Sequence, residues 1–146
     1  MLMTGFFALM CLGKLTFPND VKLCNWKKVT KWSTVVISDQ QYEFHLPSHK
    51  ADPFFKGNHV IITKKQYCHI NPLSIFVAFL ASCDEKFLLS SPLWVTPKGS
   101  MPTWHFFITQ LCRYFEKDIT GQSMRARGTT SLAESSVPPS LIQFIG

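Results

Sequence analysis

Acidic residues are scarce in this sequence. Nine Asp and Glu stand against fifteen Lys and Arg, which gives a formal net charge of +6. The excess is concentrated between positions 22 and 65, where eight Lys face three acidic residues. A charge excess of this sign suits a polyanion or an acidic membrane surface, so this segment is where we expect a phosphate-facing surface. A basic face that is merely solvated is the alternative interpretation.

Closely spaced cysteine pairs are absent. The cysteines are odd in number and contain no CxxC pair, whereas a secreted disulfide framework normally has an even, tightly spaced set. The pattern therefore indicates a reducing compartment and small buried side chains. The five are Cys11, Cys24, Cys68, Cys83 and Cys112.

No spacing typical of a metal site or a hydrolase occurs. His45 and His49 are separated by Pro47, which prevents a helix from aligning them. Cys68-His69 has no partners at zinc spacing. Because GxSxG and Gly-rich phosphate loops are missing too, we expect no metal and no small-molecule substrate.

Long hydrophobic runs are also missing. The apolar opening "MLMTGFFALMCLGKLTF" is too short to span a bilayer, and it lacks both a basic start and a cleavage pattern. It therefore predicts a buried helix, with a signal sequence as the weaker alternative and no membrane partner. The positions at helical spacing are Leu2, Phe6, Leu9 and Gly13.

The middle of the chain predicts strands and then helices. Ser33–Asp39, "QYEFHLP" and "HVIIT" read as three neighbouring strands, with Tyr42, Phe44 and Leu46 on one face of the second. Asn71 followed by Pro72 marks the start of a helix. Further helices follow, so we expect one mostly helical α+β unit over residues 1–146, with a small three-stranded antiparallel sheet.

The C-terminal stretch carries the most specific pattern. Gln122 and Arg125 open a helix of small residues, and "VPPSLIQFIG" follows it. This stretch resembles the second signature box of the tyrosine recombinase (phage integrase) family, and most of all the recombinases of fungal mobile elements. Small residues let such a helix pack closely, so that the arginine points to one fixed place.

Two upstream stretches resemble the same family, in the same order. "GFFALMCLGKLTFPND" is similar to the first box, and "FHLPSHKADPFFKGNHVII" is similar to the hairpin that carries the family's lysine, here Lys50. The resemblance covers nearly the whole chain. It implies a partial tyrosine recombinase catalytic domain over residues 1–146.

The resemblance also implies a chemistry and a partner. The family cleaves double-stranded DNA by attack of a Tyr hydroxyl on a backbone phosphate, which two Arg side chains clamp. A Lys protonates the leaving oxygen and a His assists proton movement. The energy stays in the covalent bond, so no cofactor is required. A role in DNA integration and recombination, in the nucleus, follows from the resemblance.

This chain departs from the family at several of these positions. Arg125 and Lys50 match the second arginine and the lysine, and both are expected to contact DNA. Gln122 stands in place of the His, and Cys11 in place of the first Arg. The chain ends at Gly146, before the family's nucleophilic Tyr. The expected protein is thus a truncated, catalytically dead, DNA-binding remnant of a recombinase.

Two alternatives stay open at this point. The chain could be a basic DNA-binding module without cleavage, or a structural or secreted fragment with no nucleic-acid role. Self-association is a further expectation, because the final apolar helix has no following helix to cover it. Its apolar residues are Leu141, Ile142, Phe144 and Ile145.

Overall fold

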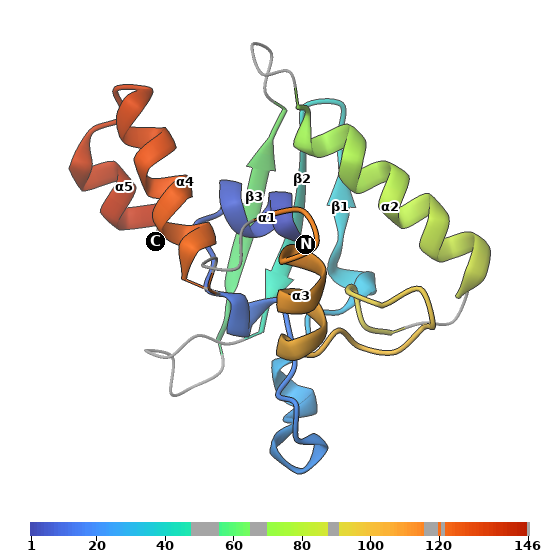
Figure 1. The fold of residues 1–146 in the computed structure, drawn as a ribbon. Coiled ribbons are helices and arrows are strands. Elements are labelled where there is room, and N and C mark those ends of the chain that lie inside the picture. Colours follow the sequence, from blue (N-terminus) through green and yellow to red (C-terminus); the bar gives the residue numbers. More distant parts are fainter. Residues whose placement is uncertain (48–55, 65–69, 88–90, 116–119, 121, 146) are drawn as a thin grey trace. The chain divides into compact units, whose positions relative to one another are not determined.

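The computed structural model describes residues 1–47, 56–64, 70–87, 91–115, 120 and 122–145 of the 146-residue chain. The chain divides into two compact units. Unit 1 combines Met1–Leu23 with Pro102–Gly146, and unit 2 is Cys24–Met101. The predicted α+β class with a small antiparallel sheet is confirmed (Figure 1). Whether the two units form one domain stays a prediction.

Unit 1 contains only helices among its described elements. These are α1 (Leu2–Phe7), the 3₁₀-helices η1 (Leu12–Lys14) and η2 (Val21–Leu23), α3 (Trp104–Leu111), α4 (Ser123–Glu134) and α5 (Pro139–Ile145). The predicted N-terminal helix is shorter than its apolar spacing suggested. It ends at Phe7 because Leu9 has a φ of +50°, a left-handed conformation that no helix can continue through.

Two glycines allow α1 and α4 to pack closely in unit 1. A Cβ atom on Gly128 of α4 would lie 2.5 Å from the backbone oxygen of Phe6 and 2.7 Å from Cδ2 of Leu9. A Cβ atom on Gly5 of α1 would collide with the side chain of Met124, which is buried. The glycine at position 128 of α4 therefore has a packing reason: a larger residue there would push α1 away.

The chain after α1 is tied to the start of α3. The backbone N–H of Phe17 donates to the carbonyl of Pro102 at 2.9 Å, and that of Trp104 donates to the carbonyl of Phe17 at 2.9 Å. The Thr103 hydroxyl accepts from the Phe106 N–H at 3.1 Å and caps α3. The two backbone bonds of Phe17 join segments about 85 residues apart in sequence.

The apolar helix α5 is partly covered. Ile142 is buried, whereas Leu141 is 49% exposed. The side chains of Phe144 and Ile145 lie outside the described residues. The expectation of self-association through this helix therefore rests on Leu141 alone among the described side chains, and it stays a prediction.

Unit 2 contains the sheet, with the strand order β1-β2-β3. The strands are β1 (Val36–Ile37), β2 (Gln41–Leu46) and β3 (Asn58–Thr63), all antiparallel. The first strand is much shorter than the predicted Ser33–Asp39, because the 3₁₀-helix η4 (Trp32–Thr34) occupies its beginning. The alternation in β2 is confirmed, since Tyr42, Phe44 and Leu46 are all buried.

The buried face of the sheet packs on α2 (Pro72–Lys86). The rings of Tyr42 and Phe76 stack with their centroids 3.9 Å apart, and Trp94 meets Phe44 edge to face at 6.1 Å. The predicted start of α2 is confirmed, because the Asn71 side chain accepts from the Leu73 N–H at 3.1 Å. None of the helices in the described ranges has the length and apolar character needed to cross a membrane.

Candidate phosphate-binding site

Arg125 lies in the first turn of α4, the helix that packs on α1 in unit 1. Ser123 holds the beginning of this helix, because its hydroxyl accepts from the Thr120 N–H at 3.0 Å. One turn later, the Thr129 hydroxyl donates to the carbonyl of Arg125 at 3.0 Å. The close contact at Gly128 fixes the helix against α1. The backbone that carries the arginine is thus held from both sides, while the side chain itself is half-buried.

The structure brings Arg125 and Cys11 together. The Nη1 atom of Arg125 donates to the Sγ atom of Cys11 at 3.4 Å, although the two residues are 114 positions apart in sequence. Cys11 is exposed and lies directly before η1. A thiol sulfur is a weak hydrogen-bond acceptor, so an anionic oxygen would be a stronger partner for this guanidinium. The two positions for which the resemblance implied an arginine pair are therefore neighbours.

Gln122 lies at the N-cap position of α4. Its side chain makes no capping hydrogen bond and is exposed, and its backbone carbonyl accepts from the Ala126 N–H at 3.1 Å. It is three residues from Arg125, a spacing at which helical side chains point to the same side. A glutamine amide can donate to a phosphate oxygen, but it cannot act as a base near neutral pH.

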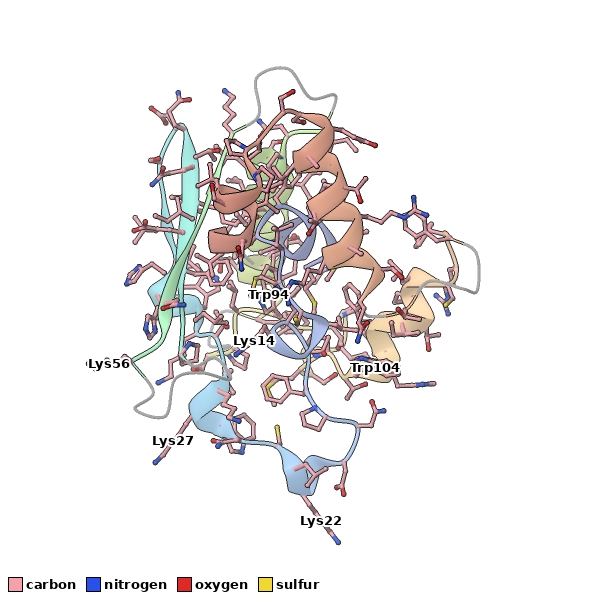
Figure 2. The ribbon with its side chains drawn as sticks, turned by 90° about the vertical axis from the view of Figure 1, so that its left-hand side faces the viewer. Lys14, Lys22, Lys27, Lys56, Trp94 and Trp104 are labelled. Carbon is pink, nitrogen blue, oxygen red and sulfur yellow. The ribbon has the colours of Figure 1, made fainter. Side chains whose placement is uncertain are left out.

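The predicted Lys50 lies outside the described residues, and so do His49, Cys68 and His69. The rest of the basic segment is described in large part, and the lysines that the structure describes there are exposed. Figure 2 shows Lys22 and Lys27 with their side chains pointing away from the ribbon. The described lysines of the segment are Lys22, Lys27, Lys28, Lys31, Lys56 and Lys64.

Sequence reasoning missed a residue inside this basic segment. Trp26 is 65% exposed, the most exposed of the four tryptophans in the chain. The available signal was "NWKK", in which an aromatic residue stands directly beside two lysines. Stacking of bases on such side chains is typical of nucleic-acid binding proteins.

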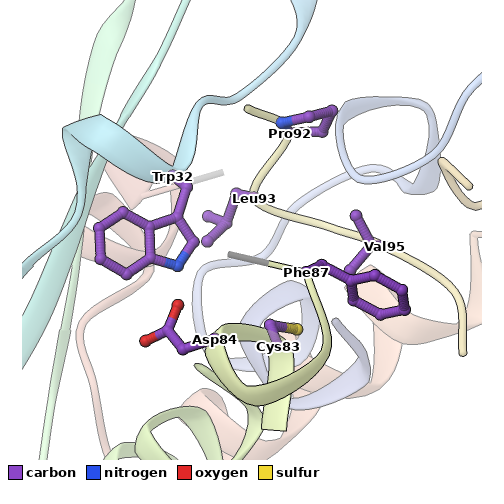
Figure 3. Close-up of a pocket in the computed structure, with 7 residues that line it drawn as sticks. All are labelled: Trp32, Cys83, Asp84, Phe87, Pro92, Leu93 and Val95. Atoms are coloured by element: carbon purple, nitrogen blue, oxygen red, sulfur yellow. The ribbon is translucent and has the colours of Figure 1, made fainter. Parts of the chain in front are cut away.

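Unit 2 also has a small cavity, distinct from the arginine site. Its volume is about 90 Å³, well below the several hundred Å³ of a small-molecule site. Burial raises the pKa of the Cys83 thiol in its wall, and the negative charge of Asp84 raises it further against the opposing Lys86. Cys83 is therefore a poor nucleophile, in contrast to an exposed thiol. Figure 3 shows the lining residues Trp32, Cys83, Asp84, Phe87, Pro92, Leu93 and Val95.

Comparison of the chain with protein-family models, curated proteins and solved structures gives no match. Within the described ranges, no three His, Cys, Asp or Glu side chains are grouped so that they could hold a metal ion. The interpretation of the site therefore rests on its own geometry and on the resemblance of its residues.

Proposed function

We propose that this chain is a non-cleaving, duplex-DNA-binding remnant of a tyrosine recombinase that took part in DNA integration and recombination. One observation carries the proposal: Arg125 and Cys11 lie within hydrogen-bonding distance, 3.4 Å between Nη1 and Sγ. The resemblance implies a phosphate clamp of two arginines at these same two positions. A chance match of short motifs would give no reason for residues so far apart in sequence to meet.

The same geometry explains why the remnant does not cleave DNA. Cys11 has no positive charge, so only one guanidinium can neutralise charge on the phosphate as the transition state forms. Gln122 cannot take or give a proton as the family's His does. Arg125 can still hold a phosphate by charge-assisted hydrogen bonds, which need no catalytic group. Binding is thus retained where catalysis is lost.

The exposed lysines support the same partner. Contacts between basic side chains and phosphates supply most of the affinity of non-specific DNA binding. The described lysines of the segment from 22 to 65 are exposed, so a phosphate backbone can reach them. The proposed function therefore involves weak, sequence-independent binding, with Arg125 and Lys50 as its matched contacts.

Changing both Lys50 and Arg125 to Ala should weaken duplex binding and flatten its salt dependence. Each lost phosphate contact lowers the slope of log K against log salt by about 1. For the unchanged protein we expect a dissociation constant on the order of 10⁻⁴–10⁻⁶ M. Filter binding with a short duplex over a series of salt concentrations measures both quantities.

Arg127→Ala provides the matched control for this experiment. Arg127 is an exposed residue of the same helix, and its change removes the same charge two positions away. It should cost less affinity than Arg125→Ala. Equal losses from the two single changes would show that only overall charge matters, and would contradict a specific role for Arg125.

A further inference from the structure

Trp26 forms an exposed aromatic platform on unit 2. It begins the 3₁₀-helix η3 (Trp26–Lys28), and its side chain is 65% exposed. A tryptophan that serves the core is normally buried, as Trp94 is at 4% exposure in the same unit. The position of Trp26 therefore has no explanation in the packing of unit 2.

The backbone that carries Trp26 is well held. The Asn25 side chain accepts from the Lys27 N–H at 3.0 Å, and the Asn25 carbonyl accepts from the Lys28 N–H at 2.9 Å. The next two residues, Val29 and Thr30, are buried and anchor the segment. Because this backbone is already ordered, binding a ligand on the indole would cost little conformational entropy.

The surroundings of Trp26 are uniformly positive in sequence. Lys27, Lys28 and Lys31 are exposed, and no acidic residue occurs from position 21 to position 38. A flat aromatic surface beside several cations is complementary to a ligand with both a π-face and an anionic backbone. These two chemical features occur together in nucleic acids.

We infer that Trp26, Lys27, Lys28 and Lys31 form a binding surface for single-stranded nucleic acid. One base stacks on the indole of Trp26, and the lysines contact the neighbouring phosphates. A single strand is favoured over a duplex, because the bases of a duplex are already stacked on one another and offer no free face to an indole. The surface is sequence-tolerant, since every base has a π-face.

An acidic membrane surface is the competing partner, and the observations favour it less. Interfacial binding needs a broad apolar face together with its basic residues. Here the nearest other exposed apolar residues in sequence are Leu23, 71% exposed, and Trp32, 38% exposed, and the residues between Trp26 and Trp32 are either charged or buried. Such a small apolar area contributes little insertion energy.

The inference rests on the proposed nucleic-acid function and shares the lysines of the basic segment with it, but its aromatic contact, Trp26, is separate from Arg125. Trp26 and its lysines belong to unit 2, whereas Arg125 belongs to unit 1. The two proposals can therefore fail separately: Arg125→Ala should weaken duplex binding and leave single-strand stacking intact. Trp26→Ala should weaken single-strand binding and leave duplex binding intact.

Titration of the full chain with a single-stranded oligothymidine tests the inference. Stacking on a base should quench tryptophan fluorescence, and Trp26→Ala should remove most of the quenching. Since stacking on one aromatic residue is worth about 1–3 kcal/mol per base, the affinity should fall roughly 5- to 150-fold. Trp26→Phe keeps an aromatic face and should retain part of the affinity. Circular dichroism should confirm that the variants keep the fold, because Trp26 is largely exposed.

Trp104→Ala is the matched control. Trp104 is also exposed, at 44%, but no lysine occurs from position 99 to position 116. Equal effects of the Trp26 and Trp104 changes would overturn the inference, as would a variant Trp26→Ala that binds oligothymidine normally. A membrane partner would be indicated if the protein bound vesicles containing phosphatidylserine, with a blue shift in the fluorescence emission of Trp26, and did not bind oligothymidine. That result would also overturn the inference.

Discussion

Replacing Gly128 by Val should destabilise unit 1 by about 1–3 kcal/mol, the usual cost of adding bulk to a closely packed contact. Even a first added carbon would lie 2.5 Å from the Phe6 backbone oxygen and 2.7 Å from Cδ2 of Leu9. A backbone oxygen cannot move aside unless α1 moves with it. The gain in helix propensity on replacing Gly, less than about 1 kcal/mol, does not compensate for this clash. The midpoint of urea unfolding, followed by circular dichroism, measures the change.

Gly13→Ala is the control for this prediction. A Cβ atom on Gly13 would meet nothing within 4 Å, so its free energy of unfolding should change by less than about 0.5 kcal/mol. The Gly128→Val variant should also bind duplex DNA more weakly, because α4 carries Arg125 and its contact with α1 is disturbed. Identical unfolding midpoints for the two variants would contradict the close packing of α1 and α4.

Cys11→Arg should strengthen duplex binding roughly tenfold or more. Cys11 is exposed, which leaves room for a longer side chain, and its Sγ lies 3.4 Å from Nη1 of Arg125. A second guanidinium there could share the phosphate with Arg125, and a hydrogen bond to a charged group is worth about 1.5–3 kcal/mol. The slope of log K against log salt should steepen by about 1. Filter binding over a salt series measures both effects.

The neutral change Cys11→Gln is the control. It lengthens the side chain without adding charge, so the affinity should stay near that of the unchanged protein. If Cys11→Arg and Cys11→Gln bind duplex DNA equally, position 11 does not face a bound phosphate. The two-arginine interpretation of the site would then be wrong.

Local patterns predicted the elements whose determinants are local. The alternation of Tyr42, Phe44 and Leu46 predicted β2, because strand burial follows a period of two. The pair Asn71 and Pro72 predicted the start of α2, because capping depends on adjacent residues. These features need no knowledge of the rest of the fold.

Features set by distant parts of the chain were predicted less well. The apolar spacing of the N-terminal stretch continued past Phe7, but the left-handed conformation of Leu9 ends α1 there. Apolar spacing does not encode such a conformation. The strand expected over Ser33–Asp39 kept only two residues, since the 3₁₀-helix at Trp32 takes its first part.

The candidate site also depends on features that local patterns cannot predict. No local pattern relates Cys11 to Arg125 across 114 positions, and only the resemblance to a family suggested that the two residues meet. Trp26 was missed for another reason: nothing in "NWKK" indicates whether the indole is buried or exposed. Exposure of the indole depends on the packing of unit 2. The sequence could therefore predict the basic charge around Trp26 but not the exposure of its side chain.

Alkylation of Cys11 in the presence and absence of duplex DNA tests the central claim most directly. In the free protein the exposed Cys11 should react readily, and the buried Cys83, whose pKa burial raises, should not. If Arg125 holds a phosphate, the bound duplex covers the neighbouring thiol. Peptide-resolved mass spectrometry should then show that saturating duplex slows labelling of Cys11 and leaves the half-buried Cys112 unchanged. The proposed phosphate site would be contradicted if Cys11 were labelled as fast in protein that is demonstrably bound to duplex as in the free protein.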